Sequence, residues 1–285
     1  MRHNKIISKK RNSNIISWGI IFFCVLVLSG KAYSQTDLPF SSGEQLKFTI
    51  RYKYGILMVK AGSAEYKIKE QAFKGSPMIR ASLSFRTNST FDKIYKIRDT
   101  LYSYSKPSLE PVFHQKHLNE GKTQYTEEIH YKHFSPTFTS VQSKRYSDDD
   151  VKFDKILTSD GVGYDMLNIF MFARTLDYKK LQTGDSFPLT SFVGRDAVPM
   201  KARYMGQTII DKGNIKYKTH LFEIDITDTA FSEQKTAMEM WISDDENRVP
   251  VKLRAKLKIG AAEAELSSTK GLKYPFSSKI EIPQK

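Results

Sequence analysis

The segment from Asp160 to Leu176 constrains the fold most, because beyond the N-terminal region it is the one stretch with a helical pattern. Only Asp165, Asn168 and Thr175 form a thin polar seam along it. The apolar residues that fill almost all of the remaining circumference are Tyr164, Met166, Leu167, Ile169, Phe170, Met171, Phe172, Ala173 and Leu176. A helix that is apolar on nearly every side has to be enclosed by other elements. We therefore predict one central helix over about residues 161–176, with Ser159 or Asp160 as its N-cap.

Period-two alternation dominates the rest of the chain. Residues 79–86 show it most clearly, since Ile79, Ala81, Leu83 and Phe85 alternate with polar residues. Strands are predicted at residues 46–52, 56–61, 64–68, 79–86, 94–104, 113–118, 123–131, 138–141, 186–193, 197–206, 215–226, 235–243, 249–259 and 261–269. Hairpin turns are predicted at residues 119–122, 211–214 and 244–247. This spacing indicates one all-β domain, mainly antiparallel, over residues 35–285, whose strongly curved sheet or open barrel wraps around the helix.

The N-terminus has the layout of a signal peptide. Residues 1–14 carry five cations and no acid, residues 15–28 are almost wholly apolar, and the small residues Ala32 and Ser34 follow. We predict a signal peptide over residues 1–34, cleavage after Ser34 and a periplasmic product; the alternative, a membrane anchor, would have a short span. Cys24 lies inside the apolar run with Phe23 before it, which does not fit a lipoprotein cysteine.

Composition limits the chemistry further. Cys24 is the only cysteine, so the processed chain would have no disulfide, catalytic thiol or thiolate metal site. Removing the six cations of residues 1–34 from the formal charge of +14 leaves +8. A mixed solvated surface explains this charge, and attraction to anionic lipid head groups or polysaccharide is the alternative. No nucleic-acid recognition motif is present, and we expect a monomer without a transmembrane span after cleavage.

Three sequence patterns could indicate a metal site or a catalytic site, but none has the spacing or the structural context that such a site requires. His114, His117, His130 and His133 form two His-x-x-His pairs, but residues three apart in a strand face opposite sides. The Ser-x-x-Lys sequence at Ser267 lies in a predicted strand, not at the start of a helix, and it has no partner motif. The acidic residues 148–150 lack the spacing of a calcium loop. We therefore predict no catalytic residue, no metal site and no cofactor.

The segment Met240–Val251 is the most distinctive part of the sequence. The residues Asp244, Asp245 and Asn247 suit a turn, Arg248 can reach back to these acids, and Pro250 suits the start of a strand. We interpret the segment as a tight hairpin stapled by polar side chains. The alternative is a binding role for Trp241 and Arg248.

Several segments together resemble domain-of-unknown-function family 3108. Met240–Val251 resembles the family's W-[IL]-S-D-D-x-x-R-x-P-V signature. Four further segments resemble its motifs in the same order: Phe40–Phe48 with Ala61–Gly62, Ile97–Asp99, Asp160–Arg174 and Leu181–Asp185. The resemblance covers residues 40 to about 271. It implies a periplasmic β protein with a signal peptide, and it brings no activity and no catalytic residues.

Two functions remain compatible with the sequence. In the first, a half-open β barrel binds a lipid or another apolar ligand, with Phe170 and Met171 lining the cleft, Arg174 meeting a polar head group and Trp241 in a binding role. By analogy, a curved sheet with an enclosed helix is similar to the lipoprotein carriers of the LolA type. The alternative for the aromatic residues is that they only fill a core. In the second, the chain is a structural or assembly factor of the cell envelope that acts through protein or polysaccharide contacts.

Overall fold

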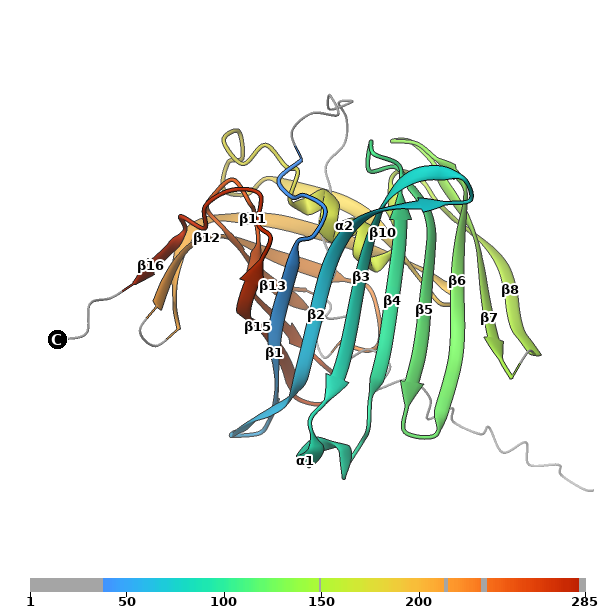
Figure 1. Cartoon of the computed structure of the whole chain (residues 1–285), viewed down its shortest axis with the longest axis horizontal. Coiled ribbons are helices and arrows are strands. Elements are labelled where there is room, and N and C mark those ends of the chain that lie inside the picture. Colours follow the sequence, from blue (N-terminus) through green and yellow to red (C-terminus); the bar gives the residue numbers. More distant parts are fainter. Residues whose placement is uncertain (1–37, 149, 213–214, 232–234, 282–285) are drawn as a thin grey trace, which may run out of the picture.

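Alternating apolar and polar residues give each long strand one face for an interior and one for solvent. The computed structural model describes residues 38–148, 150–212, 215–231 and 235–281, and it shows these strands joined in one long, curved sheet (Figure 1). The strands are β1 (Gln45–Tyr54), β2 (Leu57–Phe73), β3 (Ser76–Thr87), β4 (Arg98–Ser105), β5 (Pro111–Glu120), β6 (Thr123–Phe134), β7 (Thr139–Ser147), β8 (Asp150–Ser159), β9 (Gly163–Tyr164), β10 (Ser186–Val193), β11 (Asp196–Lys212), β12 (Ile215–Ile226), β13 (Met238–Ser243), β14 (Pro250–Lys256), β15 (Ala261–Lys270) and β16 (Lys279–Glu281).

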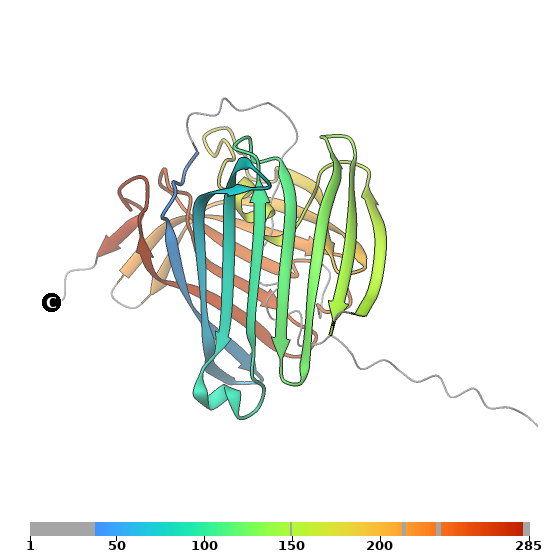
Figure 2. The ribbon, with the colours of Figure 1, turned by 45° about the vertical axis from the view of Figure 1, so that its right-hand side comes forward.

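The sheet curls into a barrel that is nearly closed (Figure 2). Its order is β8-β7-β6-β5-β4-β3-β2-β1-β15-β14-β13-β12-β11-β10-β9, and β16 pairs with β12 outside this path. All neighbours are antiparallel except β9 and β10. At the seam, the Ser159 hydroxyl donates to Thr190 Oγ1 over 2.7 Å, and the Ser143 hydroxyl donates to the Gly194 carbonyl over 2.6 Å. Across the described strands, these side-chain hydrogen bonds, rather than backbone pairing between β8 and β10, join the two ends of the sheet.

The helix α2 (Met166–Ala173) lies inside this wrapper. All of its residues except Phe172 are buried, and the Phe170 ring packs edge-on against the Tyr66 ring of β2 at 4.7 Å between centroids. The predicted enclosed helix is confirmed, but the predicted limits were wrong. The chain forms β9 at Gly163–Tyr164, and Asp165, rather than Ser159 or Asp160, is the N-cap. At the other end Arg174 is the C-cap, so the helix has eight residues.

Most predicted strands are present with ends shifted by a few residues, and three elements besides β9 were missed. The strand β8 has mostly exposed residues on both faces, so its sequence gives no clear alternation. The short strand β16 was missed as well. The one-turn helix α1 (Ser89–Asp92) precedes β4, which begins at Arg98 instead of the predicted residue 94. Part of the predicted 211–214 turn and the whole predicted signal peptide lie outside the described residues.

Gly62 shows why one of the family-like motifs contains glycine. It lies in β2 opposite Thr87 of β3, beside a register shift between Ile50 and Arg51. A Cβ atom at this position would lie 2.2 Å from the Arg86 carbonyl oxygen, a distance that backbone atoms cannot accommodate. The motif glycine is therefore required by the close approach of two strands.

Candidate functional site

Arg174 lies at the centre of a buried polar cluster at the end of α2. Its side chain is fully buried, as is that of Glu44, and the two form a bidentate pair in which Nη2 donates to Oε2 over 2.9 Å. Burial lowers the pKa of Arg174, but the Glu44 carboxylate outweighs it, so the pKa lies above its ordinary value. The pair joins the N-terminal approach to β1 with the end of the helix.

The same guanidinium fixes the β13–β14 hairpin. Its Nε and Nη2 donate to the Asn247 carbonyl over 3.1 and 2.7 Å. The Asn247 side chain in turn donates to the Tyr274 and Pro275 carbonyls and accepts from the Tyr274 amide. The helix, the hairpin and the C-terminal segment thus meet at one arginine, whose donors are committed to protein groups.

The hairpin residues take the positions that a polar staple requires. Asp245 is buried and accepts from the Ser243 hydroxyl over 2.9 Å and from the Asn247 amide over 3.0 Å. Asp244 contacts His220 Nε2 over 2.8 Å. Pro250 is the first residue of β14.

Arg248 and Trp241 lie outside this staple. The recorded contacts of the Arg248 side chain are to His220 and, at 4.3 Å, to the Tyr178 ring, not to the acids of the turn. Trp241 is half-buried, with the Lys252 ammonium 5.7 Å from its ring centroid. A binding role for Trp241 stays a prediction.

A second buried polar cluster holds the start of α2. The Asp165 carboxylate accepts from the Leu167 and Asn168 amides over 3.0 and 3.1 Å and from the hydroxyl of Ser103 on β4. His114 on β5 places Nδ1 3.3 Å from the same carboxylate. Burial raises the pKa of Asp165, but His114 and the hydrogen bonds outweigh it and leave the pKa below its usual value.

These residue types are those of a hydrolase triad, but their arrangement is not. Ser103 Oγ and the Asp165 carboxylate both lie on Nδ1 of His114, at 2.9 and 3.3 Å. A triad needs the serine and the carboxylate on opposite nitrogens, with the serine open to substrate. Here all three side chains are buried, so the cluster caps the helix and ties it to the sheet.

A third buried polar cluster lies where β4 begins and β5 ends. Asp99 and Glu120 are both buried, and within the described residues neither Asp99 Oδ2 nor Glu120 Oε1 has a hydrogen-bond partner. Burial, followed by the charge of Asp99, raises the pKa of Glu120 to about 8. Burial also raises the pKa of Asp99, although the Asn119 amide donates to it over 2.8 Å. Burial and mutual repulsion thus favour the protonated form of Glu120.

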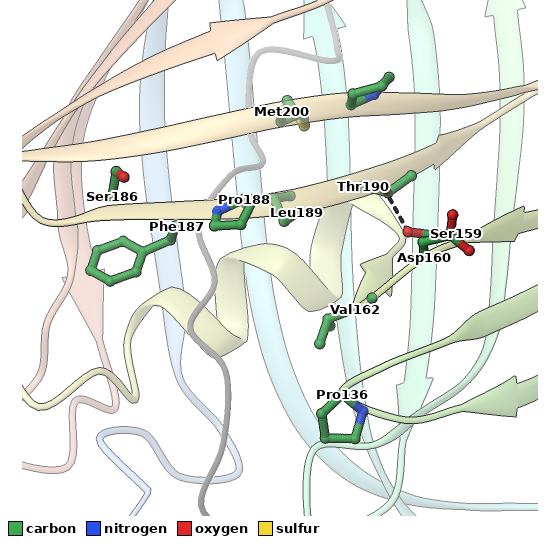
Figure 3. A pocket seen from close by; sticks show the side chains of 12 residues that line it. Pro136, Ser159, Asp160, Val162, Ser186, Phe187, Pro188, Leu189, Thr190 and Met200 are labelled. Atoms are coloured by element: carbon green, nitrogen blue, oxygen red, sulfur yellow. Dashed lines mark hydrogen bonds between the residues drawn. The ribbon is translucent and has the colours of Figure 1, made fainter.

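One open site among the described residues lies at the barrel seam, where a pocket of about 330 Å³ separates the β8–β9 connection from β10 and β11 (Figure 3). Val162 and Pro136 form one side, and β10 forms the other. The buried side chains of Phe187, Leu189 and Met200 form its apolar floor and belong to the same core as Phe170. The polar residues at its rim are Ser159, Asp160, Ser186 and Thr190. A second, larger pocket of about 820 Å³ lies beside the β2–β3 hairpin, where Gly75, Pro77 and Pro107 are among its lining residues.

The ligand-binding residues predicted from the sequence lie elsewhere. Phe170 and Met171 are fully buried in the core, and neither of them lines the seam pocket. Arg174 is occupied by Glu44 and Asn247. Sequence reasoning missed the pocket because its walls come from segments that meet only when the sheet curls. The local signal was a proline or glycine in each lining segment, at residues 136, 161, 188 and 199.

Comparison with solved structures identifies a protein of similar fold. The chain resembles a crystal structure described as a β-barrel-like protein of domain of unknown function DUF1849 from Brucella abortus, with a TM-score of 0.54 and 7% sequence identity. The match covers 81% of this chain and 98% of that one, and at this identity it shows a shared fold alone. A comparison with the curated proteins finds no match.

Comparison with models of protein families assigns the chain to one family. The model of the family described as "Protein of unknown function (DUF3108)" matches residues 47–267, so the chain belongs to this family. The matched range includes Gly62, Arg174 and the Trp241–Pro250 hairpin. In this structure Gly62, Arg174 and the polar residues of the hairpin turn hold the helix and the strands together.

Proposed function

We propose that this protein is exported to the cell envelope and binds an apolar ligand, such as an acyl chain, in the seam pocket. The observation that carries the proposal is the pocket itself, which opens outward through a polar rim and ends on side chains of the main core. Its volume falls at the lower end of the about 300–1,000 Å³ typical of small-ligand pockets. A ligand chain that enters there would extend the apolar core that surrounds α2.

The polar end of the ligand would meet the rim rather than Arg174. Ser186 and Thr190 offer hydroxyl groups, and Asp160 offers a carboxylate that would favour a hydroxylated or cationic head group over an anionic one. Arg174 is fully buried, and Glu44 and Asn247 already accept hydrogen bonds from its guanidinium.

Native mass spectrometry of protein purified from the envelope tests ligand binding. We expect a co-purifying lipid mass, and we expect Val162→Trp to remove it because the larger ring fills the pocket. Ile209→Trp is the matched control, since Ile209 is exposed on β11 away from the pocket. Absence of any bound lipid in the wild type, or equal retention in both variants, contradicts the proposal.

Export is tested separately. The cationic and apolar residues before Ser34, together with the family resemblance, support it. We expect the intact mass of the envelope fraction to correspond to a chain that begins at Gln35. Retention of residues 1–34 in a soluble cytosolic fraction would contradict export and would leave ligand binding open to its own test.

The second candidate, an envelope assembly factor, is favoured by one observation. In the part of the chain that the structure describes, β8 pairs with β7 alone, and it exposes Val151 and Ile156. An edge strand of this kind can accept an added strand from a partner. A pull-down whose partner is lost with Ile156→Lys but kept with Ile209→Lys would favour this function, whereas an unchanged set of partners would count against it.

A further inference from the structure

The hairpin between β1 and β2 exposes an unusual run of apolar residues at one end of the barrel. Ile56 is 98% exposed, and Tyr54, Leu57, Met58 and Val59 are exposed as well. Residues 57–60 pair with β1 but are exposed on both faces of β2, so this part of the hairpin projects beyond the packed part of the sheet. Folded soluble chains rarely leave a contiguous apolar segment of this size in water without a use for it.

Two neighbouring loops add to the same surface. Ile94, which is 78% exposed, follows α1, and Ile259 lies in the β14–β15 turn. The contacts that hold these loops beside the hairpin come from the β1 residue Tyr52, whose hydroxyl donates to the Ile259 carbonyl over 2.6 Å and whose ring lies 6.4 Å from that of Phe91 in α1. Figure 1 shows the β1–β2 hairpin and α1 at the same end of the molecule.

We define the tip surface by its apolar residues and by the lysines among them. The apolar members are Tyr54, Ile56, Leu57, Met58, Val59, Ile94 and Ile259, and the lysines are Lys53, Lys60, Lys93 and Lys258. Among the described residues, none of these four lysines has a recorded ion pair with an acid. Asp92, which lies next to Lys93, is paired with Arg98. The tip surface is therefore apolar at its centre and positively charged around it.

We propose that the tip surface docks the protein on the surface of an anionic lipid bilayer. Apolar side chains that project from hairpin tips can enter the boundary between head groups and acyl chains, and lysines beside them can place their ammonium groups among lipid phosphates. The positive charge favours an anionic bilayer over a purely apolar protein partner, because an anionic bilayer has an apolar interior directly beneath its negatively charged head groups. The inference does not depend on the seam pocket.

Flotation with lipid vesicles tests the proposal. Vesicles of phosphatidylcholine alone are compared with vesicles that also contain phosphatidylglycerol, at low and at high salt. We expect the protein to bind the anionic vesicles more strongly, and we expect salt to weaken this binding. All variants carry the same N-terminus, so any affinity that residues 1–37 contribute is common to them.

Two double variants separate the apolar and the charged contributions. Ile56→Asp with Leu57→Asp should lower partitioning to both kinds of vesicle by on the order of a hundredfold, because two side chains no longer leave water. Lys53→Gln with Lys60→Gln should lower partitioning about fivefold per lysine on the anionic vesicles alone. Ile209→Asp is the matched control, because Ile209 is 59% exposed but lies on β11, outside the tip surface.

Thermal melting of each variant shows whether the fold is kept, and the exposed Ile56, Leu57 and Lys60 should tolerate these changes. Wild-type protein that binds neither vesicle, or an aspartate double variant that binds as well as the wild type, overturns the proposal. Concentration-dependent dimers that the aspartate variant abolishes, without vesicle binding, would assign the tip surface to contacts between copies and would also overturn it.

Discussion

The pair formed by Arg174 and Glu44 offers the sharpest test of how α2 is held. Both side chains are fully buried, and the guanidinium has no solvent to replace a lost partner. Replacing one member leaves the other charge buried and unpaired, which typically costs about 3–5 kcal/mol. Arg174→Met should therefore remove a large part of the roughly 5–15 kcal/mol by which domains are normally stable. The Asn247 carbonyl would lose its donors in the same variant.

A double-mutant cycle measures this effect. Urea unfolding followed by circular dichroism is compared for the wild type, Arg174→Met, Glu44→Gln and the double variant. We expect each single variant to lose about 3 kcal/mol or more, and we expect the double variant to lose clearly less than the sum, because it leaves no unpaired charge. Single losses below about 1 kcal/mol, or strict additivity, would refute the idea that this pair anchors the helix.

Three further predictions concern the other buried positions. Gly62→Ala should destabilise the fold by several kcal/mol in urea unfolding, since its Cβ would collide with the Arg86 carbonyl oxygen; an unchanged midpoint would show that the strands move apart freely. Asp165→Ala should cost about 2–4 kcal/mol, about 1 for the cap and the rest for buried partners left unsatisfied, and a loss below about 0.5 kcal/mol would contradict the capping role. Burial raises the pKa of Glu120 from an ordinary 4.5 to about 8, so the folded state binds its proton more tightly than the unfolded state. The free energy of unfolding that Glu120 contributes is therefore complete below pH 4.5 and decreases as the pH rises to about 8. Glu120→Gln should flatten this slope in urea titrations repeated across that range, and a slope equal to that of the wild type would exclude Glu120 as its source.

Much of the architecture was predictable because the controlling signals are local. Period-two alternation identified most of the strands, and the nearly continuous apolar surface around Phe170 required an enclosed helix. The limits of that helix were not predictable from the pattern alone. Gly163 and Tyr164 are compatible with either a helix or a strand. They form a strand because they pair with Thr190 and Ser191 of β10.

The polar clusters were not predictable because their members are far apart in the sequence. Glu44 and Arg174 are separated by 130 positions, and Ser103 and Asp165 by 62. Each residue looks like an ordinary surface residue on its own strand or loop. The resemblance to the family pointed to Arg174 and the hairpin, but only the packed sheet shows that they bind one another. The seam pocket escaped for the same reason, since curvature brings its two walls together.

The central claim is that a nearly closed sheet encloses α2 and that buried polar groups lock it there. Hydrogen–deuterium exchange of the backbone amides from Ile169 to Arg174 tests this claim most directly. We predict that these amides exchange only as fast as the whole domain unfolds, with the protection of the central strands β1 and β2. Exchange of the helix at the rate of an open loop, while the strands stay protected, would contradict the account.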